Sequence, residues 1–136
     1  MLFELKQLNE HYPNDKTINN FTRYSEARLL KFGNLHKRAK SALIFEELIN
    51  IYPINYDIVK EYLELLFEDF LISEDQETIE KIYFLMNKVY NFPLIFNSIF
   101  TFVFQQIIFA RYQFFIKDNI TSAFEILNEA KEKISP

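Results

Sequence analysis

The sequence contains no cysteine, and this absence excludes several classes of protein. Without thiols, the 136-residue chain has no disulfide, no thiolate metal site and no cysteine nucleophile. It has a single glycine, Gly33, and therefore lacks the glycine-rich loops that bind phosphates and the G-x-S-x-G turn of hydrolases. Its two histidines, His11 and His36, are too few for a three-histidine metal site. We expect no metal site and no cofactor.

An excess of basic residues is also missing. The net charge of −4 argues against direct binding of nucleic acid, which needs a positive face to neutralise phosphates. One stretch, 94–116, is apolar enough to suggest a membrane span, but Arg111 lies within it. A central arginine alone costs roughly 2.5–3.5 kcal/mol on insertion. The first residues do not have the pattern of a signal peptide. We therefore expect no membrane association and a cytoplasmic protein.

The prolines reveal a repeat of about forty residues. Three of the four are spaced by 40, and each follows an aromatic residue, in the pairs Tyr12-Pro13, Tyr52-Pro53 and Phe92-Pro93. Proline lacks a backbone N–H and disfavours the α conformation in the residue before it, so each pair ends a helix. The repeat units are about 13–52, 53–92 and 93–136, and residues 1–12 form a leading half-repeat helix. Together they make a single domain.

Apolar residues recur at helical rather than alternating spacing, so the sequence predicts an all-α fold without strands. Asp15, Asn55, and either Asp75 or Thr121 are suited to cap the helices that follow them. Gly33-Asn34 is suited to end a helix in the left-handed conformation. The predicted helices cover about seven segments: 2–11, 15–32, 36–51, 55–71, 76–91, 94–116 and 121–134.

Part of this pattern resembles the tetratricopeptide repeat. The run Leu29–Leu35, which contains Gly33, is followed by Ala39, Phe45 and Pro53, in the order of helix, glycine turn, packed helix and terminal proline. The period is nearer 40 than the roughly 34 of that family. The resemblance extends over about residues 13–136. It implies helical hairpins stacked into a short right-handed solenoid with a concave groove for recognition.

A second resemblance is narrower. The segments Glu61–Phe67 and Asp75–Ile79, the Phe-rich helix after them and Ala123–Leu127 are similar to the C-terminal half of Rgg/MutR-type transcriptional regulators. In that family, the helical domain senses a peptide and dimerises, and it normally follows a helix-turn-helix domain. No helix-turn-helix domain fits before residue 13. The resemblance implies that this chain is the sensing and dimerising part.

The predicted helix 94–116 contains unusually ordered polar residues among its aromatics. Asn97, Thr101 and Gln105 are spaced by four, and form one stripe on the helix. Such a stripe can hydrogen-bond the backbone of an extended peptide, and Arg111 can bind a carboxylate. The alternative is that these side chains bond neighbouring helices or face water.

Charge is segregated along the chain, with residues 16–40 mostly basic and residues 57–80 mostly acidic. Most such runs are solvated faces. The alternative is a groove with one basic and one acidic wall that binds a peptide of complementary charge. Its lining would be the side chains Asn20, Arg23, Tyr24, Lys60 and Glu64.

The 16 phenylalanines bear on assembly. A short stack has open ends, and apolar surface exposed at an end favours self-association, so we expect a homodimer through the C-terminal helices. The competing interpretation is that segment 121–134 caps the stack. Carboxylate pairs such as Glu64 and Glu68 lack a histidine or metal partner, so we expect no enzyme. The sequence favours a module that binds a peptide or protein segment, and the alternative is a small adaptor or immunity-type inhibitor.

Overall fold

The regular structure of this chain is helical throughout the part that the computed structural model describes, residues 1–53, 55–90 and 99–134. The elements are α1 (Leu2–His11), α2 (Lys16–Leu30), α3 (Leu35–Ile51), α4 (Tyr56–Ser73), α5 (Gln76–Tyr90), α6 (Ile99–Arg111), the π-helical turn η2 (Tyr112–Ile116) and α7 (Ile120–Ile134). The all-α prediction is confirmed over these residues. No described helix is both long and apolar enough to cross a lipid bilayer.

Most helix ends lie where the local sequence predicts them. Tyr12 and Tyr52 follow the last residues of α1 and α3, and Phe92 lies outside the described residues. The Asp15 carboxylate accepts a hydrogen bond from the backbone N–H of Ile18 at 3.0 Å. Equivalent caps at the starts of α4 and α5 are made by the side chains of Asn55 and Asp75. Asx residues satisfy N–H groups that have no partner within the helix.

Two of the predicted helix ends are wrong. Gly33 is not in the left-handed conformation, and Asn34, with φ −72°, begins α3 by accepting a hydrogen bond from the N–H of Lys37. Glycine serves a close approach here, because a Cβ at position 33 would lie 2.8 Å from the Cβ of Lys37. The cap of α7 is Asn119, which bonds the N–H of Ser122, rather than Thr121.

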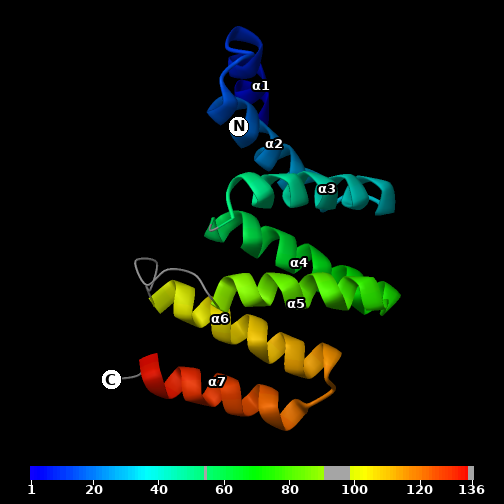
Figure 1. The fold of residues 1–136 in the computed structure, drawn as a ribbon, viewed down its shortest axis with the longest axis vertical. Helices are drawn as coiled ribbons and strands as arrows, with labels where there is room; N and C mark the ends of the chain where they lie inside the picture. The colour runs from blue at the N-terminus through cyan, green and yellow to red at the C-terminus, as the bar shows by residue number, and fades with distance from the viewer. Residues whose placement is uncertain (54, 91–98, 135–136) are drawn as a thin grey trace. The chain divides into compact units, whose positions relative to one another are not determined.

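The chain forms two compact units, Met1–Glu68 and Asp69–Pro136, called here the N-terminal and C-terminal units. The boundary falls inside α4 and coincides with none of the predicted repeat boundaries. Within the N-terminal unit, α3 and the first part of α4 run antiparallel, and within the C-terminal unit α6 and α7 form an antiparallel hairpin (Figure 1).

The core of the N-terminal unit is aromatic and aliphatic. Phe45 is fully buried, and its ring stacks on that of Tyr62 with centroids 6.1 Å apart. Tyr24 of α2 packs edge-on against Phe45, with ring centroids 6.3 Å apart. Leu48 and Leu63 are also fully buried beside them. These contacts join α2, α3 and α4 through side chains.

The C-terminal unit buries Ile82 and Val89 of α5 and Ile108 of α6, and these two helices contact each other. Ala123 and Ala130 are the buried residues of α7, and small side chains allow two helices to approach closely. After α6 the helix widens into η2, where the N–H of Lys117 bonds the carbonyl of Tyr112 five residues earlier. Such π turns occur frequently at functional sites.

Candidate functional site

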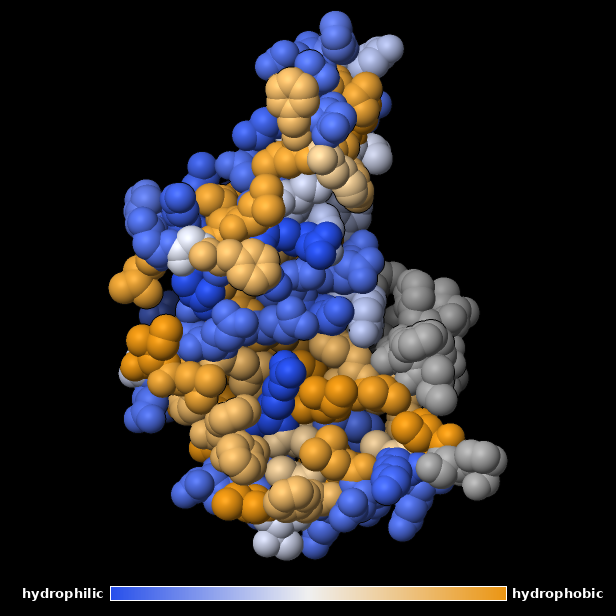
Figure 2. Space-filling view, turned by 180° about the vertical axis from the view of Figure 1, so that it is seen from behind, coloured by the Kyte–Doolittle hydropathy of each residue, from blue (hydrophilic) through white to orange (hydrophobic). Residues whose placement is uncertain are grey.

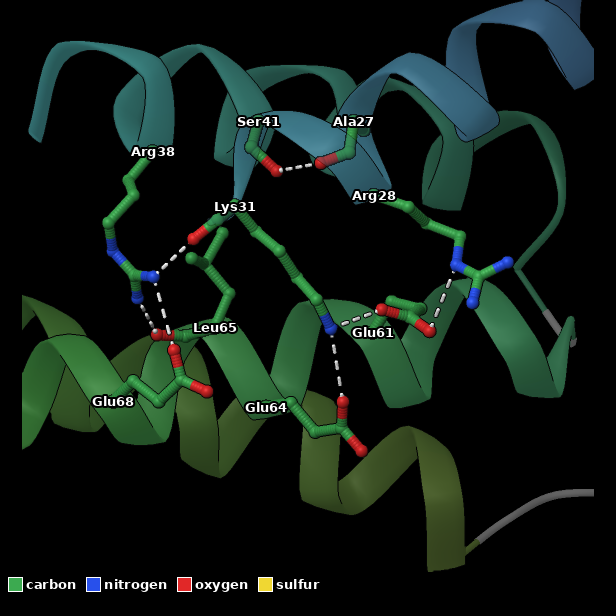
Figure 3. A network of polar contacts seen from close by, with 9 residues as sticks. All are labelled: Ala27, Arg28, Lys31, Arg38, Ser41, Glu61, Glu64, Leu65 and Glu68. Atoms are coloured by element: carbon green, nitrogen blue, oxygen red, sulfur yellow. Dashed lines mark hydrogen bonds and ion pairs between the residues drawn. The ribbon is translucent and has the colours of Figure 1, made fainter. Parts of the chain in front are cut away.

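The oppositely charged runs in the N-terminal unit meet each other. The ammonium of Lys31 is bonded to the carboxylate of Glu61 and lies 3.2 Å from that of Glu64 (Figure 3). The Nε atom of Arg28 lies 3.3 Å from a second oxygen of Glu61. The basic run of α2 therefore faces the acidic run of α4. Part of each run is thus neutralised by ion pairs within this unit.

Arg38 extends this network along α4 (Figure 3). Its guanidinium bonds the backbone carbonyl of Lys31, lies 3.4 Å from that of Leu65, and pairs with the carboxylate of Glu68 at 3.1 Å. Nearby, the Ser41 hydroxyl donates a hydrogen bond to the carbonyl of Ala27 at 2.7 Å. One cation thus satisfies carbonyls near the end of α2 and on α4.

Burial by itself lowers the pKa of Lys31, since it disfavours the charged ammonium. The hydrogen bonds and charges of Glu61 and Glu64 outweigh this effect and raise the pKa above its usual value. Lys31 is therefore a structural cation, held charged by two acids.

The remaining charged candidates of this unit lie apart. Arg23 forms an ion pair with Glu47 of α3 near the surface. Lys60 is half-buried on α4 and lines neither of the two cavities described below. Glu64 is held by Lys31. None of these three residues lines either of these two cavities.

Two of the candidates do share a cavity, here called the aromatic hollow. It has a volume of about 270 Å³ and is lined by residues of α2, the end of α3 and the start of α4: Thr17, Asn20, Phe21, Tyr24, Leu48, Tyr52, Asn55, Asp57 and Ile58. The Asn20 amide donates a hydrogen bond to the hydroxyl of Tyr52 at 3.3 Å and so positions that ring. Burial, with the charge of Glu61 next in size, raises the pKa of Tyr24 to about 12.

The polar stripe of the predicted helix 94–116 is only partly visible. Asn97 lies outside the described residues, and for Thr101 only the backbone, within α6, is described. Gln105 donates a hydrogen bond from its amide to the carbonyl of Val89 at 2.8 Å. This bond joins α6 to the end of α5, so the amide of Gln105 has a structural role.

Arg111 lies at a second cavity, here called the apolar groove. Its volume is about 360 Å³, and it is lined by residues of α6, η2 and α7: Ile107, Ala110, Arg111, Phe114, Phe115, Ala123, Phe124 and Leu127. Ala110 and Ala123 are buried, whereas the larger apolar side chains are exposed to between 37% and 60%. The rings of Phe114 and Phe115 meet edge to face, 4.9 Å apart.

Arg111 is the only charged residue among those that line the apolar groove. It is exposed, and within the described part of the chain it makes no ion pair. Figure 2 shows apolar side chains gathered over the C-terminal unit, with hydrophilic ones between them. A groove of this kind can bind an apolar segment and orient it through one carboxylate.

Comparison with known proteins gives no family. No family model, curated protein or solved structure matches this chain. Among the described residues, no group of three or more histidine, aspartate or glutamate side chains is placed to hold a metal ion.

Sequence reasoning located part of both cavities. It singled out Asn20 and Tyr24 but missed Tyr52 and Asp57, because their approach to α2 is a tertiary contact. It predicted exposed aromatics on the C-terminal helices but did not name Phe124. The available signal was that Phe124 and Leu127 are three residues apart on a helix, so they share a face.

Proposed function

We propose that this chain is a non-enzymatic, short helical-repeat module that binds a segment of a peptide or protein partner in the apolar groove. This proposal is supported above all by the exposed large apolar side chains that line the groove together with the buried alanines Ala110 and Ala123. Exposed apolar patches of this kind mark interaction sites. Its lining comes from both arms of the α6–α7 hairpin, so a bound segment would contact both helices.

The charge of the groove specifies its occupant further. Arg111 carries a guanidinium that no described acid neutralises, so a partner with a carboxylate opposite it gains a charge-assisted hydrogen bond. The acids Glu125 and Glu129 of α7 do not line the groove. No acid is among the described residues that line the groove, so two copies docked groove to groove would bring together two arginines rather than an arginine and an acid from the linings. We propose an apolar partner segment that contains an aspartate or glutamate.

The test is selection of a random peptide library against the purified chain, followed by titration of the enriched peptides. We expect enriched peptides to combine apolar side chains with an acid. Affinity should fall at least tenfold in Phe124→Asp and in Arg111→Gln. Phe32→Asp is the matched control, since Phe32 is an exposed phenylalanine of the N-terminal unit, and it should retain the affinity.

Failure to enrich any peptide, or equal binding by Phe124→Asp, would contradict the proposal. Sedimentation equilibrium of the free chain tests whether the groove is instead occupied by a second copy of the chain. A dimer that Phe124→Asp dissociates would place self-association in the groove instead. Binding of peptides would agree with the peptide-sensing role implied by the Rgg/MutR resemblance. Binding of folded proteins alone would favour the adaptor or immunity-type alternative.

A further inference from the structure

The aromatic hollow of the N-terminal unit has the construction of a cation site. Three rings line it: Phe21 and Tyr24 from α2, and Tyr52 from the end of α3. Phe21 and Tyr52 remain 48% and 37% exposed, although Leu48 and Ile58 beneath them are buried. The faces of aromatic rings carry partial negative charge and attract organic cations.

Charge around the hollow has the matching sign. Asp57 lines it, is exposed, and has no ion pair within the described residues. Burial is the main cause of the raised pKa of Tyr24; the charges of Glu61, Asp57 and Glu64 raise it further, and the charge of Arg28 lowers it. Because Glu61 and Glu64 are paired with Arg28 and Lys31, Asp57 is the acid at this wall that lacks an ion pair among the described residues. One cation of the chain already uses the ring, since the guanidinium carbon of Arg28 lies 5.8 Å from the Tyr24 centroid.

We infer that the aromatic hollow binds an arginine side chain of a partner protein, with its guanidinium against the exposed rings of Phe21 and Tyr52 and paired with Asp57. The volume of about 270 Å³ is below the roughly 300–1,000 Å³ of pockets for drug-sized ligands, and suits a single side chain. Arginine fits better than lysine because its planar, weakly hydrated head stacks on aromatic faces. This site is independent of the apolar groove, which lies in the other unit.

The test is an NMR titration of the full chain, with aromatic carbons labelled, against N-acetyl-arginine amide. The neutral comparison probe is N-acetyl-citrulline amide, which has nearly the same shape. We expect saturable shifts at Phe21, Tyr24 and Tyr52 with arginine, and at least fivefold weaker binding of citrulline. Equal binding of both probes, or shifts that do not saturate, would overturn the inference.

Two variants locate the site. Asp57→Asn should weaken binding of the arginine probe at least fivefold, and Tyr52→Leu should do the same by removing one ring. Glu125→Gln is the matched control, because it also removes one exposed negative charge but lies in the C-terminal unit, and it should leave the affinity unchanged. Circular dichroism verifies that each variant is folded. Unchanged affinity in folded Asp57→Asn and Tyr52→Leu would refute the assignment.

Discussion

Lys31 and Glu61 form a buried ion pair between the end of α2 and the first half of α4. Their side chains are only 9% and 10% exposed. Lys31 also pairs with Glu64, and Glu61 also pairs with Arg28. Thirty residues separate the two partners in sequence. The pair therefore reports on the tertiary structure of the N-terminal unit.

Removing Lys31 leaves the buried carboxylate of Glu61 with only the more exposed Arg28 as its partner among the described residues. We expect Lys31→Met to lower the free energy of unfolding by about 3–5 kcal/mol, measured by urea denaturation. The double variant Lys31→Met with Glu61→Leu should recover most of the loss, because no buried acid of that pair remains. Arg23→Met, which breaks the exposed pair with Glu47, should change stability by less than about 1 kcal/mol. A larger effect of Arg23→Met than of Lys31→Met would contradict this ranking.

Stability should decline at alkaline pH. The pKa of Tyr24 rises from 10.0 to about 12 on folding, chiefly through burial, and the pKa of Lys31 rises above 10.5. Both groups hold their protons more tightly when folded. Their contribution is complete below pH 10 and is lost as pH rises through the folded pKa values.

Spectrophotometric titration of tyrosinate tests this directly. One of the eight tyrosines should ionise near pH 12 in the folded chain, and the late phase should disappear in Tyr24→Phe. If Tyr24→Phe keeps that phase, the pKa assignment is incorrect.

Phe104 is a buried residue of α6, with an exposed fraction of 8%. Phe104→Ala should lower the free energy of unfolding by about 3–5 kcal/mol, because it removes a buried ring and leaves a cavity. Phe124→Ala is the comparison, since Phe124 is 60% exposed and its loss should be much smaller. A loss below about 1 kcal/mol in Phe104→Ala would show that α6 is not packed as described.

Gln105 and Arg111 should differ in what they support. Gln105→Ala removes the hydrogen bond to the Val89 carbonyl, and leaving that partly buried carbonyl unsatisfied should cost about 1–3 kcal/mol. Arg111→Ala removes an exposed side chain and should leave the melting temperature nearly unchanged while it weakens peptide binding. Thermal denaturation of both variants provides the comparison. A large drop in melting temperature for Arg111→Ala would make its role structural.

The helices were predictable because their signals are local. The prolines after Tyr12 and Tyr52 and the caps at Asp15 and Asn55 act within a few residues, and the structure places helix ends there. The role of Gly33 was not predictable from such signals. It depends on where the side chain of Lys37 lies after the turn, and sequence alone does not show that.

The sites were predictable only in part because they arise from contacts between distant residues. The charged runs indicated opposite signs but not that Lys31 would meet Glu61 across the unit. The exposed aromatics of the C-terminal helices were expected, but no residue pattern indicated the π turn that carries Phe114 and Phe115. The alternative that Gln105 bonds a neighbouring helix agrees with its contact to Val89.

Acidic residues recur at helical spacing along α4, at positions 57, 61, 64 and 68. Sliding this helix by one turn, about 5.4 Å, would offer Lys31 another carboxylate of the same charge. Electrostatic attraction alone cannot choose among these neighbouring alignments. The stacked rings of Phe45 and Tyr62 select the alignment, because α4 has no second aromatic residue one turn from Tyr62. Loss of this ring contact would allow α4 to pack one turn out of register while its ion pairs still form.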